Sequence, residues 1–162
     1  MNKALFIDRD GTINVDCPYC SKPEQIRIYK DAIDLIKSYK KFGFLIIVIS
    51  NQSGIERKLF SEQDAINFNE SLNNCLKKFN SGIDKFYFCP HTPDDNCNCR
   101  KPKDGLIKRA MSENDIDLIG SIFVGDRDDI DGELARNMSM HYKILKRTGN
   151  EKVISYEECL KL

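Results

Sequence analysis

The alternation of short apolar runs with amphipathic segments is the feature that most restricts how this chain can fold. In the amphipathic segments the apolar residues recur three or four positions apart, which is the spacing of one helix face. Continuous apolar strands that alternate with such helices indicate a parallel sheet with helices on both faces. The expected strands are residues 4–7, 44–49, 85–88, 121–124 and, with a weaker signal, 142–145. The pattern therefore predicts a Rossmann-like α/β fold.

Four helices are expected between these strands. The best marked one begins at a capping box formed by Ser61 and Asp64 and ends at Gly82. The other three are expected over residues 31–42, 106–111 and 134–138. In a sheet of this kind ligands bind beyond the carboxyl ends of the strands, so functional residues should follow the strands. A length of 162 residues predicts one domain, residues 1–162, without a large cap domain.

The charge balance and the apolar content argue against several classes of partner. Lysine plus arginine equal aspartate plus glutamate at 25 each, so there is no basic excess for binding a nucleic acid. No apolar run approaches the roughly 20 residues of a membrane span. The first residues also lack the apolar stretch of a secretory signal. We therefore expect a cytoplasmic protein that binds neither nucleic acid nor membranes, and we expect a monomer.

Acidic residues follow two of the expected strands. Asp8 and Asp10 come after the first strand, and Asp126 comes after the fourth. A hard divalent cation such as magnesium prefers carboxylate oxygens, and it would offset the repulsion between an attacking carboxylate and a phosphoryl group. Gly11 would let the backbone approach phosphate oxygens closely. Taken alone, each of these acids also fits a solvated turn or a helix cap.

Hydroxyl, amide and basic side chains follow the other strands. The segment SNQSG, from Ser50 to Gly54, comes after the second strand and suits a phosphoryl oxygen, although polar turns of this composition are common. Further along the chain, Arg100 can bind a phosphate through two parallel hydrogen bonds, and Lys101 offers a compact positive charge. A basic pair of this kind is also found on ordinary protein surfaces.

Three cysteines and one histidine lie within eleven residues after the third strand. They are Cys89, His91, Cys97 and Cys99. This set can close a tetrahedral zinc site with no open coordination position, so the expected role is structural. Such a zinc-stapled loop would fix Arg100 and Lys101, which follow it directly. The chain has seven cysteines, and this crowding favours metal ligation over a disulfide framework and hence a reducing compartment.

The segments DRDGT, ISNQSG, CRKP and GDRDDID, in this order, resemble the four motifs of the haloacid dehalogenase-like phosphatases. The resemblance covers roughly residues 3–149. The zinc loop and the NQSG segment are similar to those of the subgroup that contains the D-glycero-D-manno-heptose 1,7-bisphosphate phosphatases and the histidinol-phosphate phosphatases. The resemblance implies a magnesium-dependent phosphomonoesterase whose substrate is a small phosphorylated molecule.

Smaller features favour the heptose bisphosphate enzymes, which remove the phosphate at C7 of a sugar on the way to surface polysaccharides. The segments DRDGTINVD and NQSGIER and the late RTG at residues 147–149 resemble those enzymes, whereas the zinc loop suits either group. The chain departs from their pattern at Glu56, at Lys58 and at the CPYC of residues 17–20. Histidinol phosphate therefore stays open as the alternative substrate.

The resemblance also implies roles for individual residues. Asp8 would attack phosphorus to form an aspartyl phosphate, while Asp10 would protonate the leaving oxygen and then deprotonate the attacking water. Magnesium would be bound by the Asp8 carboxylate, the Asp10 backbone carbonyl and Asp126, and Ser50 and Lys101 would contact the transferred group.

Other residues are implied to orient these groups or to contact the substrate. Asp131 would orient the metal ligands, and Arg100 would recognise the substrate. The remaining expected substrate contacts are Asp16, Cys17, Pro18, Tyr19, Asn51, Gln52, Ser53, Arg57 and Arg127. The loops that carry them would have to discriminate between substrates, because no large cap domain is expected.

Two rival functions belong to other classes. A phospho-receiver domain also pairs acids after its first strand, but its phosphoacceptor follows the third strand, where this chain has Cys89. A zinc-stabilised binding module without catalysis is the second rival, and the presence of Asp8, Asp10, Lys101 and Asp126 together argues against it.

The remaining cysteines carry weaker signals. Cys17 and Cys20 form a CxxC, which elsewhere can be redox-active or half of a zinc site. Neither role is expected here, since no second pair of ligands completes a zinc site and Pro23 follows where a thioredoxin-like motif has a helix. Cys75 lies on the apolar face of an expected helix and should be buried, and Cys159 gives no signal.

Overall fold

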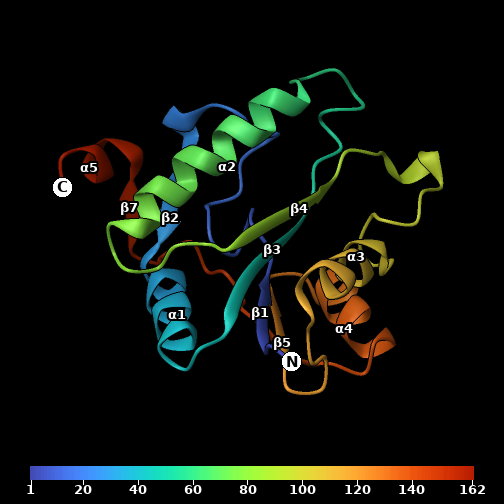
Figure 1. Ribbon diagram of the computed structural model, residues 1–162. Helices are drawn as coiled ribbons and strands as arrows, with labels where there is room; N and C mark the ends of the chain where they lie inside the picture. The colour runs from blue at the N-terminus through green and yellow to red at the C-terminus, as the bar shows by residue number, and fades with distance from the viewer.

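A computed structural model describes residues 1–162 and contains the expected parallel sheet (Figure 1). Its strand order is β4-β3-β1-β5-β6, and every neighbouring pair is parallel. The strands are β1 (Ala4–Ile7), β3 (Leu45–Asn51), β4 (Lys85–Cys89), β5 (Ile122–Gly125) and β6 (His141–Ile144). All five overlap the predicted strands, and the predicted Rossmann-like fold is confirmed.

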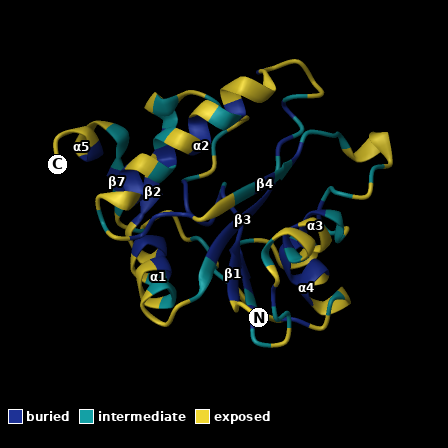
Figure 2. Cartoon of the chain, in the orientation of Figure 1, coloured by how far each residue is buried: buried dark blue, intermediate teal, exposed yellow.

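Helices cover both faces of the sheet, and the alternation of side chains along β1 separates two cores. Leu5 and Ile7 pack in one apolar cluster with α1 (Lys30–Lys41) and α2 (Glu62–Lys77). Ala4 and Phe6 pack in the other, with α3 (Gly105–Asn114) and α4 (Glu133–Asn137). Figure 2 shows the central strands buried between these layers. A strand buried on both faces needs apolar residues at every position, which explains the continuous apolar runs.

The predicted start of α2 is confirmed, but its predicted end is wrong. Ser61 Oγ accepts a hydrogen bond from the Asp64 backbone at 3.0 Å, and Asp64 accepts one from the Ser61 backbone at 2.8 Å, which is the predicted capping box. The helix ends at Lys77 rather than at Gly82. Asn80, at φ 57°, makes the left-handed turn instead of the glycine.

The sequence patterns missed a small antiparallel sheet and the last helix. β2 (Arg27–Tyr29) pairs with β7 (Val153–Ser155), and α5 (Tyr156–Leu160) follows. Strands of three residues are too short to display a period, and this pair joins segments more than 120 positions apart. A disulfide between Cys75 of α2 and Cys159 of α5 holds the carboxyl terminus beside α2 (Figure 1). No helix combines the length and the apolar character that crossing a bilayer requires.

Candidate active site

Three carboxylates and one lysine meet at the carboxyl ends of the strands. Asp8 follows β1, Asp126 follows β5, and Asp131 lies in a π-helical turn at Asp128–Gly132. A ligand oxygen of each lies within 4.8 Å of those of the other two. Lys101 Nζ lies 2.7 Å from Asp8 Oδ1 and 2.7 Å from Asp131 Oδ1. Residues from three separate parts of the chain therefore form one charged cluster, as expected for this edge of the sheet.

The surroundings of Lys101 favour its charged form. Burial by itself would lower the pKa of the Lys101 ammonium group, but the carboxylates of Asp8 and Asp131 outweigh it and raise that pKa. For Asp8 the balance differs. Burial raises the pKa of the Asp8 carboxyl well above its ordinary value, Asp131 and Asp126 raise it further, and only Lys101 acts against them. Within this cluster Lys101 is therefore the group that favours the ionised form of the Asp8 carboxyl.

The cluster can accommodate a divalent cation. Its three carboxylates face a single ammonium group, and the Asp126 carboxylate accepts only a hydrogen bond of 3.2 Å from Thr12 Oγ1. The Asp131 carboxylate has more partners. It accepts a hydrogen bond from Lys101 Nζ and hydrogen bonds of 3.3 Å from the backbone N–H groups of Asp126 and Arg127. Carboxylate oxygens are the donors that a hard cation such as magnesium prefers.

The Asp10 carboxylate lies outside this cluster and is held by a buried arginine. Arg9 donates to it twice, from Nε at 3.1 Å and from Nη2 at 2.8 Å. Gln52 Nε2 donates to Asp10 at 3.1 Å and to Ser50 Oγ at 2.6 Å. The predicted residues Ser50, Gln52 and Asp10 therefore form one network. The sequence analysis missed Arg9, because a charged residue just after a strand is usually exposed.

The turn after β1 requires a glycine and is fixed by a residue near the end of the chain. Gly11 has φ 87°, and a Cβ there would collide with the Asp126 carboxylate. Arg147 donates from Nε to the Gly11 carbonyl at 3.0 Å and from Nη2 to the Thr12 carbonyl at 2.6 Å. Its guanidinium also lies 3.6 Å from the centre of the Tyr29 ring. In the sequence, Arg147 stood out only as part of the RTG segment that resembles the heptose bisphosphate enzymes.

The predicted zinc ligands converge. Cys89 Sγ lies 2.9 Å from Cys99 Sγ, 3.3 Å from His91 Nδ1 and 3.6 Å from Cys97 Sγ. All four ligand atoms lie within 4.8 Å of one another. Burial would raise the pKa of the Cys97 thiol, but hydrogen bonds from the backbone N–H groups of Arg100 and Cys99 help to lower it to about 6. One ion can bind all four atoms, and a thiolate at Cys97 suits zinc.

The loop that ends at this cluster carries Lys101 into the site. The Asn51 side chain binds the Lys101 backbone twice, accepting from its N–H at 2.9 Å and donating to its carbonyl at 3.1 Å. Arg100 Nη1 lies 3.3 Å from the His91 carbonyl and makes no ion pair. Asn51, predicted as a substrate contact, is therefore also the residue that holds Lys101 in place.

Most of the predicted site residues line two adjoining cavities. The first, of about 170 Å³, is lined by Asp8, Asp10, Asp16, Ser50, Asn51, Arg100, Lys101, Asp126, Arg127, Ile130 and Asp131. The second, of about 480 Å³, is lined by Asp10, Asp16, Cys17, Pro18, Tyr19, Asn51, Gln52, Ser53, Gly54, Arg100 and Arg127. Arg57 lines neither cavity, and its Nε lies 3.4 Å from Ser53 Oγ. Arg127 is paired with Asp129 at 2.6 Å.

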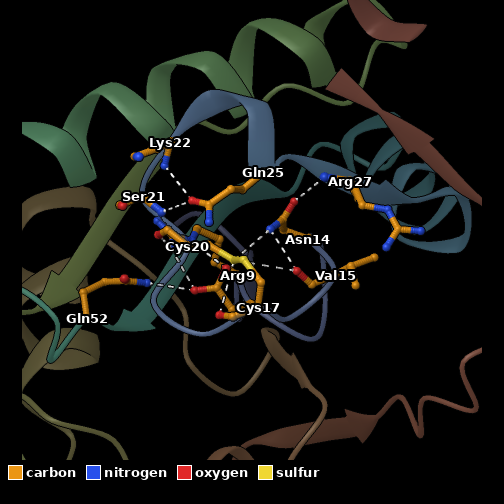
Figure 3. The surroundings of a disulfide bond; sticks show 11 residues. Arg9, Asn14, Val15, Cys17, Cys20, Ser21, Lys22, Gln25, Arg27 and Gln52 are labelled. Carbon is orange, nitrogen blue, oxygen red and sulfur yellow. Dashed lines mark hydrogen bonds and ion pairs between the residues drawn. A yellow bond between two sulfur atoms is a disulfide. The ribbon is translucent and has the colours of Figure 1, made fainter. Parts of the chain in front are cut away.

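A disulfide that the sequence analysis did not expect lies beside the second cavity, which Cys17 lines. Cys17 and Cys20 are bonded, with their Cα atoms 5.5 Å apart (Figure 3). The carbonyl of Cys20 accepts a hydrogen bond of 3.1 Å from Arg9 Nη2. Together with Cys75–Cys159, this leaves Cys89, Cys97 and Cys99 as the free cysteines. The expectation that the cysteines favour metal ligation over disulfides is therefore wrong for four of the seven, and it stays a prediction for the other three.

Comparisons with known proteins agree with this arrangement. A family model described as polynucleotide kinase 3 phosphatase matches residues 8–147. A protein of Thermoplasma volcanium named probable D-glycero-D-manno-heptose-1,7-bisphosphate 7-phosphatase is 48% identical over 144 residues, covering 89% of this chain and 99% of the relative. The D-glycero-beta-D-manno-heptose-1,7-bisphosphate 7-phosphatase of Haemophilus influenzae is 36% identical over 156 residues, covering 92% of this chain and 84% of the relative.

A solved structure supports the same grouping. The crystal structure of D,D-heptose 1,7-bisphosphate phosphatase from B. bronchiseptica, complexed with magnesium and phosphate, matches with a TM-score of 0.80 at 27% identity. The match covers 88% of this chain and 79% of that chain. The chain belongs to the haloacid dehalogenase-like phosphatases, as its four motifs indicated. It is a phosphoric monoester hydrolase, and its relatives lie in the heptose bisphosphate group.

Proposed function

We propose that the chain is a magnesium-dependent phosphatase that removes the C7 phosphate of D-glycero-D-manno-heptose 1,7-bisphosphate through an aspartyl phosphate. The observation that carries this proposal is the buried contact of 2.7 Å between Lys101 Nζ and Asp8 at the wall of a cavity. The relatives of the chain are named for the heptose bisphosphate activity. Heptose bisphosphate is a small phosphorylated sugar, and the two cavities are open to a molecule of that size.

Asp8 is the proposed nucleophile. Its carboxylate attacks phosphorus, the bond from phosphorus to the sugar oxygen breaks, and the phosphoryl group becomes an acyl phosphate on Asp8. Water then attacks phosphorus, inorganic phosphate leaves, and the carboxylate is regenerated. Lys101, kept charged by Asp8 and Asp131, stabilises the negative charge that develops on the phosphoryl oxygens, and Ser50 donates a hydrogen bond to one of them.

Asp10 is the proposed acid and base. In the first half-reaction it gives a proton to the departing sugar oxygen, and in the second it takes a proton from the attacking water. Its side chain is 21% exposed and lines both cavities, so it has access to a substrate in either half-reaction.

The carboxylates of Asp8 and Asp126, with the backbone carbonyl of Asp10, are the proposed magnesium ligands. A bound ion would neutralise charge between the attacking carboxylate and the phosphoryl group. The excess of carboxylate over ammonium in the cluster supports this set, and the Asp10 carboxylate is left to its role in proton transfer. A structural zinc is proposed at Cys89, His91, Cys97 and Cys99, and its four donor atoms leave no position open for a substrate.

One side chain of the second cavity, Arg100, favours a bisphosphate over histidinol phosphate, although the lining also includes the carboxylates of Asp10 and Asp16. Arg100 and Arg127 both line it, and Arg100 has no carboxylate partner. A second phosphate could bind the free guanidinium through two hydrogen bonds, which histidinol phosphate cannot form because it carries one phosphate only. The other contacts proposed with the sugar are Asp16, Cys17, Pro18, Tyr19, Asn51, Gln52 and Ser53. Arg57 would need to turn towards the cavity to join them.

Phosphate release in the presence of magnesium tests the proposal. The substrates are both anomers of D-glycero-D-manno-heptose 1,7-bisphosphate, histidinol phosphate and an oligonucleotide with a 3′ phosphate, which the name of the matching family model suggests. We expect a heptose bisphosphate to have the highest kcat/KM, by at least about tenfold or roughly 1.4 kcal/mol. Asp8→Asn should be inactive on every substrate.

Each other outcome changes a defined part of the proposal. A preference for histidinol phosphate would keep the mechanism and replace the substrate. A preference for the oligonucleotide would also contradict the expectation that nucleic acid is not a partner. Turnover by Asp8→Asn would rule out the covalent intermediate. Gel filtration of the same preparation tests the predicted monomer, and the cytoplasmic location stays a prediction.

A further inference from the structure

Arg9 is the largest side chain that the fold buries completely. Its exposed fraction is 0%, although it directly follows the proposed nucleophile. A buried guanidinium without partners would cost several kcal/mol, so its contacts decide whether the fold can tolerate it. Four hydrogen bonds and the face of one aromatic ring surround it. Such a site is built for arginine and not for a positive charge alone.

The contacts of Arg9 divide into anchors and one target. The anchors are the Asn69 side chain, at 3.0 Å from Nη1, the Phe68 ring, whose centre lies 4.3 Å from Cζ, and the Cys20 carbonyl, at 3.1 Å from Nη2. Two of these lie on α2, and the third lies in the loop closed by the Cys17–Cys20 disulfide (Figure 3). The target is Asp10, whose two carboxylate oxygens are both bound.

This arrangement orients Asp10. A planar guanidinium that binds both oxygens of a carboxylate restricts its position and its rotation, which a lysine ammonium cannot do. Gln52 supplies a third hydrogen bond to Asp10, at 3.1 Å, from the side that carries Ser50. The Asp10 side chain is thus held between α2, the disulfide loop and the turn after β3. Its exposed part, 21% of the side chain, lies where the two cavities meet.

We propose that Arg9 is a positioning residue for proton transfer: it holds the Asp10 carboxyl group where the leaving oxygen departs, and α2 and the disulfide loop hold Arg9. The proposal rests on the proposed role of Asp10 as acid and base. Arg9 makes no hydrogen bond with the side chains of Asp8, Lys101 or Asp126. Its effect should therefore appear only in steps that need the proton of Asp10.

Two substrates with different leaving groups can show whether Arg9 positions Asp10 or only stabilises the fold. An alkoxide from a sugar phosphate is a poor leaving group and needs the proton, whereas p-nitrophenolate leaves without it. The ratio kcat/KM covers only the steps up to departure of the leaving group, so the later hydrolysis of the aspartyl phosphate does not enter. Loss of a correctly placed acid should lower kcat/KM for the sugar phosphate alone.

The test compares Arg9→Lys with the native enzyme, in the presence of magnesium, on heptose bisphosphate and on p-nitrophenyl phosphate. Arg9→Lys keeps the charge and loses the two-point contact. We expect kcat/KM to fall by about 100-fold on the sugar phosphate, as for a catalytic group misplaced by about 1 Å, and by less than about threefold on p-nitrophenyl phosphate. Asp10→Asn should show the same selective loss to a larger extent, in line with the 10²–10⁴-fold typical of a general acid.

Asn69→Ala is a second variant that tests the same proposal if Arg9→Lys does not fold. It removes one anchor of Arg9 without touching Asp10, and it should give the same selective loss at a smaller size. Equal losses on both substrates, in whichever of the two variants is folded, would overturn the proposal and leave Arg9 a structural residue. Absence of native activity on both substrates is a different result, because it would contradict the phosphatase function and not the role of Arg9 within it.

Discussion

The seven cysteines form two groups that the fold treats in opposite ways. Cys89, Cys97 and Cys99 lie with His91 in one cluster, form no disulfide, and belong to the loop that leads to Lys101. The other four are paired in two disulfides at Cys17–Cys20 and Cys75–Cys159. The spacing of cysteines along the chain does not separate the groups, since Cys17 and Cys20 form a CxxC and Cys97 and Cys99 are closer still.

Their surroundings separate them instead. In the cluster, burial raises the pKa of the Cys89 and Cys99 thiols, whereas at Cys97 backbone N–H groups outweigh burial and help to lower the pKa to about 6. The three sulfur atoms and a His91 nitrogen lie within 4.8 Å of one another, which suits a metal. Cys75 and Cys159 are buried in the apolar core between α2 and α5, away from any histidine or further cysteine of that cluster. Cys17, which is bonded to the buried Cys20, lines the second cavity. Metal ligation and disulfide formation can therefore coexist in this chain, and the three sites should respond to different reagents.

The largest effect is expected at the cluster. Cys97→Ser, or removal of zinc with a chelator followed by restoration of magnesium, should release the loop and displace Lys101. We expect a loss of at least about 100-fold in kcat on p-nitrophenyl phosphate, because a small displacement of a catalytic group has an effect of this size. The measurement is the rate together with the zinc content per chain. A zinc-free protein with full activity would contradict the structural role given to the cluster.

A smaller effect, on stability alone, is expected at Cys75–Cys159. The bond closes a loop with a sequence separation of 84, and its loss should lower the free energy of unfolding by about 2–4 kcal/mol. Cys75→Ala combined with Cys159→Ala, measured by urea unfolding, should show this loss with little change in kcat. The native protein treated with a reductant is a second comparison, which keeps all cysteine side chains but loses both disulfides. Free thiols at both positions in the untreated protein would show that the bond does not form.

The sequence predicted local features of the molecule and missed contacts between distant segments. The strands of the sheet and the acids after β1 and β5 were predictable, because apolar runs and strand ends are local features. The Cys75–Cys159 bond and the β2–β7 pair were missed, because each joins distant segments. Arg9 was missed for another reason: its charge predicted exposure, and only its contacts with Asp10, Asn69 and Phe68 explain the burial.

The smallest effect is expected at Cys17–Cys20, and it should fall on the substrate rather than on the fold. The bond closes a short loop, so its contribution to stability should be at most about 2 kcal/mol. Cys17→Ser combined with Cys20→Ser frees the loop that lines the second cavity, and ordering it again on binding should raise KM for heptose bisphosphate about threefold with kcat nearly unchanged. The Cys75→Ala and Cys159→Ala double variant is the control, because it loses a disulfide remote from the cavities. An unchanged KM in the first variant would mean that the loop keeps its shape without the bond, and a large fall in kcat would mean that the Cys20 carbonyl is needed to hold Arg9.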